Sequence, residues 1–154
     1  MQEDVIMSDL GNSLKVALAD TFVLMTKTLG YHWNVEGPNF KEYHELFGMI
    51  YEDLWSAVDP LAEKIRTLDE YAPGSLKRFT ELSTLEEDVK IPTASMMMER
   101  LYAANEQVIQ SVQTALEQAQ LAKDEGIVNF LGERLESHTK FRWFLKATGK
   151  KERA

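Results

Sequence analysis

Two of the three histidines in this chain lie twelve residues apart in the stretch YHWNVEGPNFKEYH, residues 31–44. Gly37 and Pro38 stand between His32 and His44, and this pair of residue types ends helices and reverses the chain. Imidazole nitrogens bind metal ions and exchange protons near neutral pH. Because the chain has no cysteine, a metal site here must combine histidine with carboxylate ligands.

Two carboxylates follow on the side of the helix that is expected to carry His44. At 100° per residue, Asp59 lies about 60° from His44 around the helix axis, and Glu63 lies about 40° from Asp59. Along the axis, however, fifteen residues span about 22 Å, whereas metal–ligand bonds measure about 2.0–2.2 Å. One chain therefore cannot bring all three side chains to one ion.

Two copies of the chain can form such a site. If this helix crosses a second copy antiparallel about a two-fold axis near residue 52, His44 of one copy meets Asp59 and Glu63 of the other. His32 lies just across the turn and can supply a second nitrogen. Ordinary roles stay open for each residue: His32 hydrogen-bonded in the core, His44 partly buried, and the carboxylates on a solvated helical face.

Four segments with apolar residues at every third or fourth position must hold these side chains. These segments are residues 8–35, 40–68, 93–123 and 126–148. A long connection over residues 70–92 lets the second and third helices run in the same direction, which predicts an all-α, ferritin-like four-helix bundle. Within that connection, Ser83 and Glu86 match a capping box and predict one short helix.

Two further features bear on the site. None of the three histidines has a glutamate three residues before it, so the Glu-x-x-His pairs of a di-iron site inside the bundle are absent. Pro60 interrupts the second segment, removes a helical hydrogen bond to Ser56 and disfavours α geometry at Asp59. We therefore expect a kink next to Asp59.

Composition narrows the class of protein. The chain has 154 residues, of which 44% are hydrophobic and 27% charged, and this predicts a single domain over residues 1–154 with short flexible termini. No apolar run approaches the roughly 20 residues of a membrane span, and the acidic N-terminus is unlike a signal peptide. We expect a cytoplasmic protein without membrane contact. The formal net charge of −8 repels nucleic acid and favours cations.

One set of residues shares its types and spacing with a known family. The set is Tyr31-His32-Trp33-Asn34-Val35, Gly37, Asn39-Phe40, His44, Asp59 and Ala62-Glu63-Lys64-Ile65. This pattern resembles the Dps family (DNA-binding protein from starved cells), the mini-ferritins. The similarity is strongest over residues 28–75, weakens afterwards and partly returns at 138–140 and 143–145.

The resemblance implies both an assembly and a chemistry. It implies a hollow dodecamer with 23 symmetry, with ferroxidase sites at its two-fold interfaces. His32 and His44 would be ligands from one subunit, Asp59 and Glu63 ligands from its partner, and Trp33 would lie beside the iron. Fe(II) would be oxidised, preferably by hydrogen peroxide, and stored as ferric oxyhydroxide, which protects against oxidative stress. Zinc can substitute, because histidine and carboxylate ligands also accept it.

The chain departs from the family pattern in places. Many relatives carry an acidic residue at the position of Gly48, so a ligand, or a group that orients a ligand, is missing and we expect a weaker second iron site. Asp124 and Glu125 are the candidates for an acidic pore through which iron enters. An exposed loop would explain both residues equally well.

Two other functions compete with iron oxidation. One is a DNA-binding nucleoid structural protein without significant ferroxidase activity. Family members usually bind DNA through a lysine-rich tail, but here no Lys or Arg precedes Lys15, and only Lys146 and Lys150-Lys151-Glu152-Arg153 could serve. We therefore expect weak or absent DNA binding. The other alternative is a helical assembly or adhesion module whose histidines are merely structural.

Overall fold

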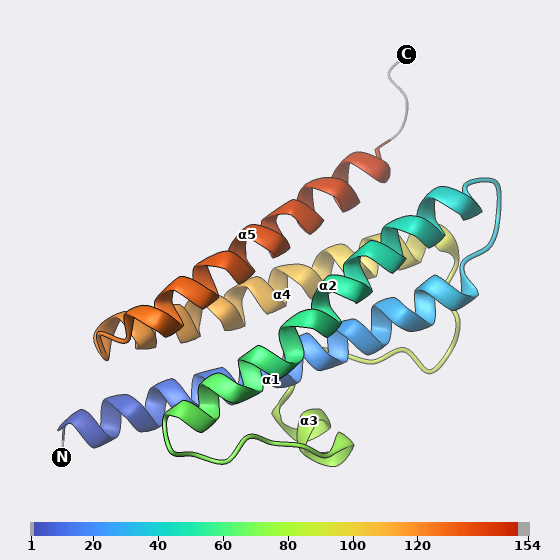
Figure 1. The fold of residues 1–154 in the computed structure, drawn as a ribbon. Helices are drawn as coiled ribbons and strands as arrows, with labels where there is room; N and C mark the ends of the chain where they lie inside the picture. Colours follow the sequence, from blue (N-terminus) through green and yellow to red (C-terminus); the bar gives the residue numbers. More distant parts are fainter. Residues whose placement is uncertain (1, 151–154) are drawn as a thin grey trace.

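The structure is a computed structural model that describes the backbone of residues 2–150 and the side chains of residues 9–150. It has four long helices in a bundle and a short helix in the long crossover (Figure 1). The helices are α1 (Gln2–Asn34), α2 (Phe40–Thr67), α3 (Leu76–Leu82), α4 (Ala94–Leu121) and α5 (Glu125–Thr148). α1 and α2 are antiparallel, whereas α2 and α4 run the same way, so the predicted all-α architecture is confirmed. Within residues 2–150, no helix is long and apolar enough to cross a membrane.

Local residue types explain where the long helices end. Gly37 has φ = +118°, in the left-handed region that favours glycine, and Pro38 follows it where the chain turns from α1 into α2. Thr93 and Asp124 precede α4 and α5, and their side-chain oxygens accept hydrogen bonds from backbone N–H groups of the first helical turn. Short turns therefore hold α1 against α2 and α4 against α5.

Apolar side chains from all four long helices fill one core. In α1 they recur every four residues at Leu10, Leu14 and Leu18, and Phe47 and Leu54 of α2 are fully buried in the same core. Burying each such side chain contributes about 1.5–3 kcal/mol. α2 packs mainly against α1 and makes few contacts with α5. One long side of α2 therefore stays free of contact with the other helices.

Asp20 of α1 anchors the crossover after α3. Its fully buried carboxylate accepts hydrogen bonds from the Ser83 hydroxyl (2.7 Å) and from both the N–H and the hydroxyl of Thr84 (2.7 and 2.8 Å). The hydroxyl of Ser111 on α4 donates a fourth hydrogen bond. One carboxylate thus joins α1, the crossover and α4.

The position predicted for the short helix is wrong. α3 begins at Leu76, where the Ser75 hydroxyl caps it by accepting a hydrogen bond from the N–H of Arg78, and it ends before Ser83. The capping box at Ser83 and Glu86 does not start a helix: the Ser83 hydroxyl donates to Asp20 and accepts from the N–H of Leu85 rather than from that of Glu86. A local pattern was overridden by a contact with a distant residue.

Pro60 does not interrupt the second helix, and the kink expected beside it stays a prediction. α2 continues through Pro60, and Asp59 keeps its helical geometry. Ser56, whose carbonyl loses its helical partner, is exposed, so water can satisfy that oxygen. Proline therefore does not separate Asp59 from Glu63 into different helices.

A second anchor fixes the end of the crossover. Asp88 accepts hydrogen bonds from Lys27 (3.0 Å) and Arg100 (2.7 Å), and it also accepts a short one from the Tyr31 hydroxyl. Burial alone would raise the pKa of Asp88, but the hydrogen bonds from Tyr31 and Lys27, together with the positive charges of Lys27 and Arg100, outweigh burial and lower it. Burial and the neighbouring carboxylate raise the pKa of Tyr31, so the phenol stays protonated and keeps donating. This anchor holds the last turn of α1 in place.

Candidate metal centre

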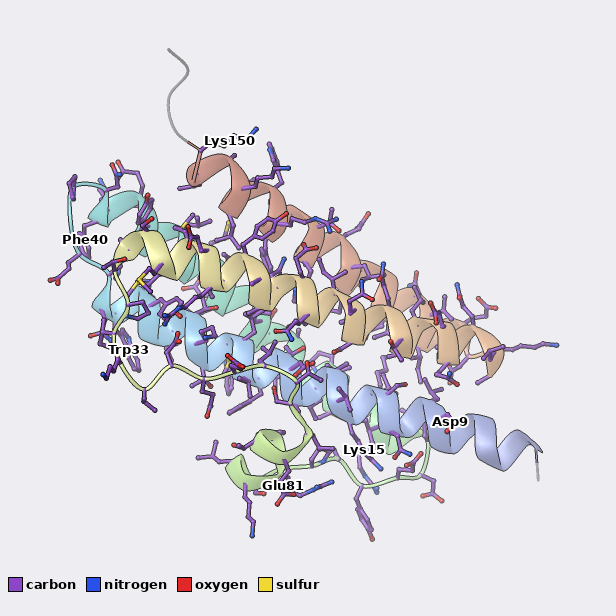
Figure 2. The ribbon with its side chains drawn as sticks, turned by 180° about the vertical axis from the view of Figure 1, so that it is seen from behind. Asp9, Lys15, Trp33, Phe40, Glu81 and Lys150 are labelled. Carbon is purple, nitrogen blue, oxygen red and sulfur yellow. The ribbon has the colours of Figure 1, made fainter. Side chains whose placement is uncertain are left out.

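The turn between α1 and α2 brings His32 and His44 into contact. His32 lies in the last turn of α1 and His44 in the second turn of α2. Their rings stack with centroids 3.8 Å apart and an interplanar angle of 12°. Figure 2 shows the two helix ends that carry Trp33 and Phe40 at the same end of the bundle, opposite Asp9. The structure therefore pairs the two histidines, as the sequence predicts.

Each histidine donates a hydrogen bond to the backbone of the other. Nδ1 of His32 lies 2.6 Å from the carbonyl oxygen of His44, and Nδ1 of His44 lies 2.7 Å from the carbonyl oxygen of His32. A carbonyl oxygen can only accept, so both Nδ1 atoms carry the proton in the neutral rings. Both Nε2 atoms then keep a free lone pair, and both side chains are only partly buried. This is the state in which histidine binds a metal ion, with its second nitrogen orienting the ring.

The predicted carboxylate ligands lie elsewhere on the same subunit. Asp59 and Glu63 are both exposed on α2, one helical turn apart. Because α2 is continuous from Phe40 to Thr67, the rise per residue keeps Asp59 about 22 Å from His44 along the axis. Among the side chains of residues 9–150, no three His, Asp or Glu groups come together to hold an ion. Within one chain the two histidines and the two carboxylates therefore lie far apart.

Exposed aromatic side chains lie beside both the histidine pair and the carboxylates. Trp33 is 68% exposed beside His32, and Trp55 is 60% exposed one turn before Asp59. Trp55 and Asp59 line a groove of about 560 Å³ between α2 and the crossover, with Pro73 and Phe79 on its other side. Large exposed aromatic side chains of this kind are typical of protein–protein contacts.

The third histidine has a different environment. His138 of α5 is completely buried, and its Nδ1 lies 2.8 Å from the side-chain oxygen of Asn105, whose amide donates to the His138 carbonyl. Burial, and then the positive charge of Arg134, lower the pKa of His138 to about 3. The imidazole is therefore neutral, and its Nε2 has no hydrogen-bond partner among the described residues. The signal that could have identified it as a core residue is its helical spacing from Leu131, Phe141 and Leu145, all of which are buried in α5.

Two minor expectations stay predictions. The carboxylate of Asp124 is engaged as the cap of α5, whereas Glu125 is exposed in its first turn. Of the basic residues near the C-terminus, Lys146 and Lys150 are exposed, and residues 151–153 lie outside the described part of the chain.

The architecture, four long helices with a crossover between the second and third, defines a ferritin-like bundle. A family model for the ferritin-like domain matches residues 12–154. The structure superimposes on Dps from Thermosynechococcus elongatus with a TM-score of 0.95 and 26% identity, covering 99% of this chain and 97% of that one. Dps from Staphylococcus aureus gives a TM-score of 0.89 and 29% identity, covering 94% and 97%.

Sequence relatives agree with this result. DNA protection during starvation protein 2 of Bacillus anthracis is 30% identical over 87% of this chain and 92% of its own length. An uncharacterised low temperature-induced protein of Nostoc is 36% identical over 88% of this chain and 77% of its own. This chain belongs to the ferritin-like family and, within it, to the Dps proteins.

Proposed function

We propose that this protein is an iron-sequestering ferroxidase. It would oxidise Fe(II), preferably with hydrogen peroxide, at sites between subunits and store the ferric product inside a hollow dodecamer. The observation that carries the proposal is the pair of imidazoles in which both Nδ1 atoms are bound to backbone oxygens. Two oriented Nε2 atoms at a partly exposed surface suit a divalent ion with open coordination positions.

The arrangement of α2 supports a site shared by two subunits. An antiparallel pair of α2 helices about a two-fold axis near residue 52 would place the His32 and His44 of one subunit opposite the Asp59 and Glu63 of the other. The exposed side of α2 leaves room for such a pair. Each dimer would then hold two equivalent sites about 22 Å apart.

The chemistry balances with Fe(II) and peroxide as substrates. One hydrogen peroxide accepts an electron from each of two ferrous ions, and with two waters this yields two FeO(OH) and four protons. Histidine and carboxylate ligands bind both oxidation states of iron, and the carboxylates offset the added positive charge. Keeping both electrons in a fixed site avoids the release of hydroxyl radical. Zinc fits the same donor set and would compete with iron.

A complementation experiment tests both the activity and the shared site. The His32→Ala/His44→Ala and Asp59→Asn/Glu63→Gln variants are each expected to lose rapid peroxide-dependent oxidation of anaerobically loaded Fe(II). Unfolding and refolding them together would restore about a quarter of the sites, because each mixed dimer contains one intact set of ligands. Ferric absorbance and iron retained on the assembly in size exclusion measure the recovery.

A matched control removes a carboxylate elsewhere. Glu133→Gln changes an exposed carboxylate of α5 and is expected to leave oxidation unchanged. If both double variants oxidised and retained iron like the unaltered protein, the ferroxidase assignment would fail. If the two inactive variants gave no recovery after mixing, although they co-assembled, the site would not be shared between subunits.

A further inference from the structure

Gly48 of α2 lies directly beneath the ring of His32. A Cβ atom at this position would be 3.0 Å from Cε1 and 3.2 Å from Nδ1 of His32, shorter than ordinary van der Waals contacts. The glycine is buried because the imidazole covers it. The Cβ of any other residue here would press on the ring of His32, which would have to shift by a few tenths of an ångström.

The carbonyl of His44 explains why the ring approaches so closely. In an α-helix the carbonyl of each residue points toward the N–H of the residue four positions later. The oxygen of His44 therefore points along α2 toward Gly48, and Nδ1 of His32 donates to this same oxygen at 2.6 Å. A side chain on residue 48 would stand beside the oxygen and crowd the donor.

We infer that Gly48 is a positioning residue for the metal site. Without a side chain, it leaves the His44 carbonyl open to His32 and so holds that ring in the tautomer whose Nε2 can bind metal. The inference rests on the proposed function and deepens it. It also changes how the missing acidic residue can be tested, because Gly48→Asp would add a carboxylate and displace His32 at the same time.

The variant Gly48→Ala tests this role with the smallest possible side chain. Its matched control is Gly132→Ala in α5, where an added Cβ meets nothing within 4 Å. Both substitutions remove a glycine from a helix interior, so both gain the same intrinsic helix propensity. Circular dichroism and size exclusion establish that each variant folds and assembles like the unaltered protein.

The first readout is the tautomer of the histidines without metal. Nδ1 of His32 and His44 faces a backbone carbonyl, and Nδ1 of His138 faces the side-chain oxygen of Asn105. At pH 8, nitrogen-15 solid-state NMR of histidine-labelled protein should therefore show a single tautomer, with Nδ1 protonated. Gly48→Ala should add signals of the other tautomer for one histidine in three, and Gly132→Ala should not.

The second readout is anaerobic Fe(II) binding. Disturbing the group that orients a metal-binding histidine typically lowers affinity about 10- to 100-fold, so Gly48→Ala should bind Fe(II) at least about tenfold more weakly than Gly132→Ala. A single tautomer in Gly48→Ala, or unchanged affinity despite a second tautomer, would overturn the inference. If the unaltered protein bound no Fe(II), the proposed function would fail, and the NMR comparison would still decide whether Gly48 positions His32.

Discussion

Acidification from pH 7 to pH 5 is expected to destabilise the bundle through His138. This imidazole is fully buried, and its pKa is lowered to about 3 by burial and by Arg134. In the unfolded chain a histidine has a pKa of about 6.5. Between these values the unfolded chain binds a proton that the folded chain excludes, so stability is greatest above pH 6.5 and is lost as the pH falls toward 3.

The size of the effect follows from the pKa difference. One pKa unit corresponds to about 1.36 kcal/mol, so His138 alone should cost about 2 kcal/mol per subunit between pH 7 and pH 5, and about 4 kcal/mol by pH 3. The free energy of unfolding is measured by urea titration of helical circular dichroism. The protein concentration must be held fixed, because dissociation of an oligomer shifts the apparent stability.

The comparison needs a variant that does not titrate. His138→Gln retains a polar group able to bond with Asn105 but has no ionisable proton, so its loss of stability between pH 7 and pH 5 should be about 2 kcal/mol smaller than that of the unaltered protein. His32→Ala/His44→Ala should keep the full dependence on His138. Equal losses in His138→Gln and in the unaltered protein would refute the linkage.

Three further predictions concern the anchors and the surface. Asp20→Ala leaves four hydrogen-bond donors without their acceptor and should lower the free energy of unfolding by about 3 kcal/mol or more. Ser111→Ala removes only one of these hydrogen bonds and should lower it by about 1 kcal/mol. Similar losses for the two variants would contradict this expectation. Asp88→Ala removes three hydrogen bonds that hold the crossover. Trypsin should therefore cut after the exposed Lys90 faster than in the unaltered protein. An unchanged rate of cleavage would show that other contacts hold this segment. Twelve subunits at −8 would carry a formal charge of −96, so no DNA mobility shift is expected near neutral pH even at low salt. A shift that disappears on truncation after Thr148 would show that the C-terminal lysines bind DNA.

Much of the fold could be predicted because helices are local structures. The spacing of apolar residues located α2, α4 and α5 to within a few residues, and the Gly37-Pro38 turn implied that α2 returns along α1. The beginning of α3 was missed, because Ser75 and Ser83 are both competent caps. The choice between them depends on Asp20, which is remote in sequence.

The candidate site, too, could be predicted from the sequence only in part. Residue types and helical spacing alone predicted that His32 and His44 lie close together and that Asp59 and Glu63 share one side of a helix. They also excluded a metal site formed by His44, Asp59 and Glu63 of a single chain. Only the tertiary structure decided that each imidazole donates to the other's backbone, because the tautomer depends on a facing oxygen that no spacing reveals. It also gave Gly48 a role, since the lack of a side chain becomes meaningful only when a ring from another helix occupies that space. Periodicity is set by neighbours along the chain, whereas these contacts require α1 and α2 to be packed first.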